Sequence, residues 1–314
     1  MLLLTYKNKS PTITFIRGTI IACYISLLLL SCGLSDESDE NGGFSRPDPV
    51  LCEDKHPAIS PNNEDVAFIR YPGGADTSII GGIYLVNIYS LNVELVLKDY
   101  YCYVAWGDSA TLYLSDPASY GKGIIKYSFT SNRIDTLSDQ PGKSISYYNN
   151  SIVFEYGSEI WMYDIVYNRV SRVAYSGKYR TPSWSSDGTY ILASMHVPNN
   201  TSAVAIVLLA TTGTIIDQVN EPRRDHSYLY PKVNNDGDHI LCEHGYPTNN
   251  GYIYDVVEVN MASGSSTTIV RGRYPIYNDS NNVIIYSYHT DVFSDGLRLY
   301  MINTENNEIV QLTF

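Results

Sequence analysis

The sequence predicts an all-β protein, specifically a six-bladed β-propeller built of four-stranded antiparallel blades. Three observations support this prediction. A phrase of Pro, two residues, a polar turn and an apolar strand recurs along the chain, and pairs of alternating apolar strands follow each copy. No stretch after residue 31 shows the apolar period of an amphipathic helix. Repeats of roughly 40–50 residues are typical of propeller blades.

The recurring phrase counts the blades. Its prolines in the four clear copies are Pro57, Pro182, Pro231 and Pro275, spaced 125, 49 and 44 residues apart. The first interval is nearly three times the others, so it should hold two more repeats. Degraded copies are found there at 104–109 and 146–150. The chain is therefore expected to contain six units.

The second half of each unit predicts a β-hairpin. Two short segments of alternating apolar residues are joined by a polar turn, as in 83–86 with 94–97, 160–163 with 170–173 and 299–302 with 309–312. Asn, Asp and Gly at the turns are typical of antiparallel hairpins. Each unit thus supplies four strands, as a propeller blade requires.

The fourth repeat carries a specific resemblance. Residues 182–193, with the sequence PSWSSDGTYILA, resemble the WD40-like repeat of the TolB family, and 299–303 with 311–313 fit the end of the same repeat. The resemblance extends over 55–314 and is weakest in the second and third repeats. It implies a propeller that makes protein–protein contacts in the cell envelope. Neither the α/β domain of TolB nor a following hydrolase domain is expected here.

The N-terminal segment is expected to be a targeting signal. Lys7, Lys9 and Arg17 form a basic region without acids, and an apolar run at 19–30 is too short for a membrane span. The run ends in LLSC at 29–32, which resembles a bacterial lipobox. We therefore predict a lipoprotein signal peptide at 1–31, lipidation of Cys32, an acidic flexible tether at 32–50 and the propeller at 51–314. The alternative is an ordinary signal peptide or anchor with an incidental cysteine.

Charge and anchor together predict the location and the partners. Removing 1–31 takes away three cations and changes the formal net charge from −12 to about −15, which argues against nucleic acid and anionic lipid as partners. The expected location is the outer membrane, with attachment through the lipid on Cys32. Four acids at 36–40 resemble the export signal of surface lipoproteins in Bacteroidetes-like bacteria, whereas a plain tether would leave the protein facing the periplasm. A monomer is expected.

Three cysteines remain once Cys32 is acylated. Cys52 and Cys102 begin neighbouring repeats and are the candidate disulfide pair, with two free thiols as the alternative. Cys242 lies in an apolar strand and is expected to be a buried free thiol.

The predicted strand order places the candidate site on one face of the propeller. The links between blades and the ends of the second strands share that face, and the links hold an excess of Lys and Arg. The candidate ligand- or partner-binding residues in the links are Lys178, Arg180, Arg223, Arg224, His226, Arg271 and Arg273. The candidate histidines at the second-strand ends are His196, His244 and His289.

Two functions fit this arrangement. Recognisable catalytic motifs are missing, and no cofactor is predicted, so the main prediction is a non-catalytic binding or scaffolding propeller whose partner is an envelope protein or a glycan. The alternative is a lyase, a hydrolase or a glycan-binding protein acting on acidic polysaccharide. The three histidines could bind a metal or ligand, or could simply hydrogen-bond nearby loops. Whether the protein is an enzyme, and whether it binds metal, stays open.

Overall fold

The first half of the chain supplies three four-stranded units. The computed structural model describes residues 52–72, 80–99, 101–116, 123–198, 200–221, 223–249, 251–278, 280, 282–289 and 296–314. The first unit comprises β1 (Cys52–Ile59), β2 (Asp65–Pro72), β3 (Gly82–Asn87) and β4 (Val93–Leu97). The second comprises β5 (Tyr103–Trp106), β6 (Thr111–Ser115), β7 (Ile124–Ser128) and β8 (Arg133–Ser138). The third comprises β9 (Lys143–Tyr148), β10 (Ser151–Tyr156), β11 (Glu159–Asp164) and β12 (Arg169–Ala174).

The second half supplies three more. The fourth unit comprises β13 (Tyr179–Trp184), β14 (Tyr190–Val197), β15 (Asn200–Ala210) and β16 (Ile215–Gln218). The fifth comprises β17 (Ser227–Val233), β18 (His239–Thr248), β19 (Gly251–Asn260) and β20 (Ser266–Arg271). The sixth comprises β21 (Arg273–Tyr277), β22 (Val283–His289), β23 (Leu297–Asn303) and β24 (Ile309–Gln311). In the described residues no helix is long and apolar enough to span a membrane.

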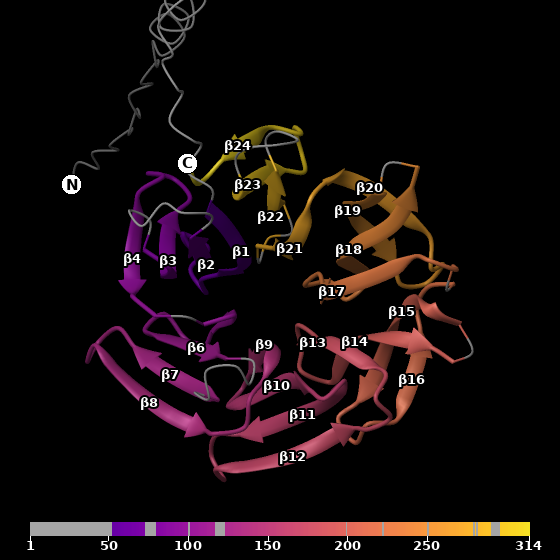
Figure 1. The fold of residues 1–314 in the computed structure, drawn as a ribbon, viewed down its shortest axis with the longest axis horizontal. Coiled ribbons are helices and arrows are strands. Elements are labelled where there is room, and N and C mark those ends of the chain that lie inside the picture. The colour runs from indigo at the N-terminus through magenta and orange to yellow at the C-terminus, as the bar shows by residue number, and fades with distance from the viewer. Residues whose placement is uncertain are drawn as a thin grey trace, which may run out of the picture. The chain divides into compact units, whose positions relative to one another are not determined.

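The units are arranged as the blades of a propeller (Figure 1). Within each unit the strands pair antiparallel in sequence order, and the first strand is innermost (Figure 1). The first strands contact one another in turn around a closed ring, from β1 through β5, β9, β13, β17 and β21 back to β1. The all-β, four-stranded propeller prediction is thereby confirmed, including the two units with degraded sequence phrases.

The six units correspond to five hydrogen-bonded sheets. Four sheets have four strands each, and the fourth and fifth units merge into one sheet of eight. A single parallel pair, Val204 with Ser227, joins them. This pair lies in the part of β15 that β16 leaves uncovered, because β16 pairs only with Val207, Leu208 and Leu209.

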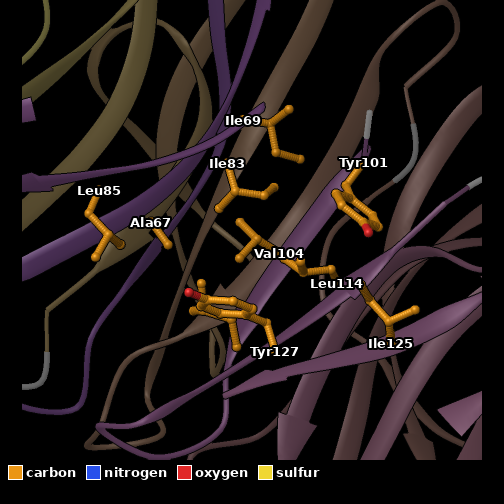
Figure 2. Packing of buried hydrophobic residues seen from close by; sticks show 10 residues of the cluster. Ala67, Ile69, Ile83, Leu85, Tyr101, Val104, Leu114, Ile125 and Tyr127 are labelled. Carbon is orange, nitrogen blue, oxygen red and sulfur yellow. The ribbon is translucent and has the colours of Figure 1, made fainter. Parts of the chain in front are cut away.

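The core is a series of apolar layers between adjacent blades. The layer between the first and second blades combines Ala67, Ile69, Ile83 and Leu85 with residues of the next blade, including Leu114 (Figure 2). Alternating side chains of a strand point to opposite faces of its sheet, so each blade contributes to the layer on either side. This is why the period-2 pattern of the sequence predicted the blades correctly.

The ring is joined at a seam between the first and sixth blades. Arg298 on β23 donates through Nη1 to the carbonyl oxygen of Cys52, and the Ser287 hydroxyl donates to the carbonyl of Asp54 at 2.8 Å. In the described part of the chain no strand is exchanged across this seam.

The candidate disulfide does not form, and the alternative of two free thiols holds. Cys52 and Cys102 are both free thiols, because Cys52 is buried at the seam with the sixth blade while Cys102 precedes the first strand of the second blade. Cys242 is buried and free, as predicted, and burial raises the pKa of its thiol. The predicted signal peptide, the tether and Cys32 lie outside the described residues.

Candidate functional site: the central channel

The proline phrase encodes a backbone irregularity in the innermost strands. His56, Ser144, Thr181, Tyr230 and Tyr274 have positive φ angles between 46° and 54°. Four of these residues directly precede the proline of the phrase, and each coincides with a shift in the register of the first strand against the second. Such bulges re-aim side chains, although a non-glycine residue in this region costs of order 1 kcal/mol. The bulges present these five side chains to the central channel.

An aromatic cluster narrows the channel at the level of the bulges. The ring of His56 lies 4.3 Å from that of Tyr274, 4.4 Å from that of Tyr103 and 5.5 Å from that of Tyr230, measured between centroids. The remaining cavity at this level is about 50 Å³. Burial lowers the pKa of His56 to about 3, with smaller contributions from the charges of Lys55, Arg273 and Lys232. His56 is therefore neutral at physiological pH.

On one side of this constriction lie the links between blades; we call this the link side. Here Arg273 makes a bidentate ion pair with Glu243, at 3.1 and 3.2 Å. The carboxylate of Glu243 is fully buried and also accepts the backbone N–H of Tyr274 at 3.3 Å. Arg273 lies over the ring of Tyr254, 4.1 Å from its centroid. Burial raises the pKa of Glu243, and the bidentate Arg273 opposes that effect.

Glu155 repeats this arrangement two blades earlier. Its buried carboxylate accepts the N–H of Thr181 at 3.1 Å, so an acid on a second strand again holds the left-handed residue of the next blade. Burial raises the pKa of Glu155, while the charges of Lys143 and Arg180 act to lower it. Both of those cations are exposed at the rim of the channel. The link side therefore carries positive side chains above a layer of buried acids.

The other end of the channel is the turn side, where the first strand of each blade turns into the second. It contains a cavity of about 300 Å³. The aromatic and charged residues in its lining are Trp106, Tyr147, Trp184, Lys232 and Tyr277. Burial lowers the pKa of Lys232 to about 8.

Comparison with known proteins identifies the fold. No family model and no curated protein matches the sequence. Among solved structures, TolB from Acinetobacter baumannii superposes with a TM-score of 0.61 at 12% identity, covering 84% of this chain and 79% of that one. A TolB from Agrobacterium tumefaciens gives 0.55 at 15%, covering 71% and 83%. This chain has the TolB-like β-propeller fold. An oligogalacturonate lyase from Vibrio parahaemolyticus shares the fold, with a TM-score of 0.52 at 9% identity and coverage of 84% and 79%.

The TolB-like propeller divides the predicted site residues into two groups. Arg180 and Arg273 lie by the channel, in the first strands of the fourth and sixth blades. Arg223 and Arg224 are exposed in the link before β17, and Lys178 is in the link before β13. Arg271 is half exposed on the outer strand β20, where its Nε lies 3.6 Å from Asp255. One residue, Gly272, separates the inward Arg273 from the outward Arg271.

Two of the predicted histidines pair with each other. His226 Nδ1 and His244 Nε2 share a hydrogen bond of 2.8 Å, and His244 stacks on Tyr228 with centroids 4.4 Å apart. Burial lowers the pKa of His244 to about 4, with a smaller contribution from His226. His244 lies inside β18 rather than at its end, because that strand continues to Thr248.

The other two predicted histidines belong to the fourth and sixth blades. His196 is on β14, where its backbone N–H bonds the carbonyl of Lys178 at 2.9 Å, and His289 ends β22 with its side chain outside the described residues. The described residues contain no group of three or more His, Cys, Asp or Glu arranged to hold a metal ion.

Sequence reasoning missed the residues inside the channel. His56, Tyr103, Glu243 and Lys232 were not selected, although His56 and Lys232 flank prolines of the recurring phrase. The signal that could have found His56 and Lys232 is their position within the repeat, because residues next to the proline line the channel in the four bulged blades that carry this proline.

Proposed function

We propose that this chain is a non-catalytic binding propeller of a bacterial cell envelope, with its partner at the link-side mouth of the channel. The observation that supports this most is the exposed pair Lys143 and Arg180 above the buried Glu155. The acids of this mouth already bind backbone or Arg273, so they hold the blades together. The exposed cations remain available to a negatively charged partner.

The proposed partner is an acidic segment of another envelope protein. Exposed cations at a rim favour association through complementary charge. The net charge of −12 makes the rim a local exception on an acidic protein. Binding at this mouth should therefore weaken with salt.

A charge-reversal pair tests this proposal. K143E/R180E should lose capture of an envelope partner from extract by about tenfold or more, since two attractive charges become repulsive. R169E is the matched control, because Arg169 is exposed on the outer strand β12, away from the channel. Equal capture by wild type, K143E/R180E and R169E would contradict a partner site at this mouth.

The membrane attachment is proposed to be a lipid on Cys32. The lipobox-like sequence LLSC at 29–32 supports it, as does the acidic tether that follows. Cys32→Ala should abolish metabolic labelling with palmitate and move the protein from the outer-membrane fraction to the soluble fraction. Retention of the label in C32A would show that the anchor lies elsewhere.

A second candidate is binding of acidic polysaccharide at the same mouth. The shared fold with oligogalacturonate lyases and the basic rim favour it. The test is binding of polygalacturonate to wild type and K143E/R180E, with ultraviolet detection of unsaturated products. Salt-sensitive binding without product formation would support a glycan-binding propeller. Product formation would instead favour a lyase, and no binding would leave the protein-partner proposal.

A further inference from the structure

The turn side of the channel holds a recess that the proposed function does not use. Its cavity of about 300 Å³ lies on the opposite side of the aromatic constriction from the link-side mouth. This volume reaches the lower end of the range for small-molecule sites. Its lining includes aromatic side chains of four different blades, contributed by Trp106, Tyr147, Trp184 and Tyr277.

The aromatic walls are held by hydrogen bonds to neighbouring blades. Trp106 donates through Nε1 to the carbonyl of Ala58 at 2.9 Å, and Trp184 donates to the carbonyl of Ser151 at 3.3 Å. The hydroxyl of Tyr277 donates to Glu258 at 2.6 Å. Rings fixed in this way lose little conformational freedom when a ligand stacks on them, so the recess is preorganised.

Lys232 is the unusual residue of this recess, and it also lines the small cavity at the constriction. Its position in the first strand corresponds to Ala58, Ala105, Ser146, Ser183 and Ile276 in the other blades, as the strand registers show. Five of the six positions are thus small or apolar, and only Lys232 carries a charge.

Lys232 also lacks a counter-charge. Among the described residues no carboxylate forms an ion pair with it, and no hydrogen-bond partner is found for its ammonium group. The other charges that act on His56, which the charge of Lys232 also reaches, are those of Lys55 and Arg273, and both are positive. A lysine kept in the channel under these conditions costs stability, and a bound anion would compensate for that cost.

We propose that the turn-side recess binds a small organic carboxylate, whose ring stacks on the aromatic walls while its carboxylate pairs with Lys232. The proposal concerns the opposite end of the channel from the link-side mouth and does not depend on the function proposed there. A sugar acid and an aromatic acid both carry this chemistry.

Calorimetric titration of the full chain with matched probes tests the proposal. Phenylacetate represents the aromatic acids and glucuronate the sugar acids. Phenylacetamide and glucose are their uncharged counterparts. Wild type should bind at least one acid at least tenfold more tightly than its uncharged counterpart. The acid that binds identifies the kind of ring. Equal affinity for acid and uncharged counterpart, or no binding of either acid, would overturn the proposal.

Two variants assign the effect to the recess. K232M should lose at least tenfold in affinity for the acid while keeping the far-ultraviolet circular dichroism of wild type. K126M removes a lysine from β7, the third strand of the second blade, and should bind as wild type does. Undiminished binding by K232M would also overturn the proposal, because the charge would then come from another residue.

Discussion

The two ends of the central channel each hold a half-buried cation, but only one of the two has an acidic partner. On the link side Arg273 is paired with the buried Glu243 through two hydrogen bonds and is covered by Tyr254. On the turn side Lys232 faces an aromatic cavity with no acid partner in the described part of the chain. Arg273 therefore holds two blades together, whereas Lys232 can pair with a bound ligand.

The largest effect is expected from breaking the link-side pair. Arg273→Met leaves the Glu243 carboxylate buried without its cation, and removing one partner of such a pair typically costs about 3–5 kcal/mol in the free energy of unfolding. Urea denaturation measures the loss. Arg271→Met is the matched control, since that residue is half exposed and its variant should change stability by less than about 1 kcal/mol. A similar loss in the free energy of unfolding for both variants would contradict the idea that the paired arginine is more important for stability than the exposed one.

Removing the turn-side charge should have the opposite sign. The folded-state pKa of Lys232 is lowered from 10.5 to about 8, so the folded protein binds fewer protons than the unfolded chain between these values. At pH 7 the charged lysine therefore costs stability, and Lys232→Met should stabilise the protein by about 1–3 kcal/mol. The gain should shrink as the pH rises from 8 toward 10. A destabilised K232M at pH 7 would mean that the ammonium group has a partner.

The neutral histidines predict a pH dependence at the acid end. The pKa of His56 is lowered to about 3 and that of His244 to about 4, from 6.5 in the unfolded chain. Neutral His56 and His244 do not lower the free energy of unfolding above pH 6.5. As the pH falls below 6.5, the unfolded chain gains protons that the folded protein does not, so the free energy of unfolding decreases. Between pH 7 and pH 5 each of the two histidines should lower the free energy of unfolding by about 1–2 kcal/mol. In thermal denaturation, the melting temperature of His56→Phe should fall less steeply with decreasing pH than that of wild type. An unchanged slope would show that His56 gains a proton without cost to stability.

The smallest effect should come from loosening one wall of the turn-side cavity. Trp106→Phe removes the hydrogen bond to the carbonyl of Ala58 but keeps an aromatic ring. The expected loss is about 1 kcal/mol, typical of one hydrogen bond, and affinity for the carboxylate probe should fall less than in K232M. A greater loss of affinity in W106F than in K232M would make stacking, rather than charge, the main source of binding.

The fold could be predicted because blade formation depends on local patterns. Alternation of apolar residues and the turn residues between them suffice to build a hairpin, so even the repeats at 104–109 and 146–150 form complete blades. The merger of the fourth and fifth blades was not predictable, because it depends on how far β15 extends toward a neighbour.

The site was only partly predictable, because the direction in which a side chain points, into the channel or outward, depends on single residues. Arg271 and Arg273 are alike in sequence, yet the chain passes from the outer strand β20 to the innermost strand β21 at Gly272. A side chain on Gly272 would meet the ring of Tyr286, with the added carbon 2.5 Å from Cδ2, so the crossing needs glycine. Lys232 was overlooked because the bulge at Tyr230 sets its direction, and a bulge is not visible in an apolar pattern.

The first and sixth blades meet at the seam as two separate four-stranded sheets. Each blade takes its four strands from one continuous segment, and the bonds from Ser287 and Arg298 to the first blade do not involve a shared sheet. A circularly permuted chain, opened in the link between β8 and β9 and joined across the seam by a short linker, would keep every strand pairing of the ring. The order of the blades along the chain is therefore separable from the structure they form, and new termini could be placed on the link-side or the turn-side face at will.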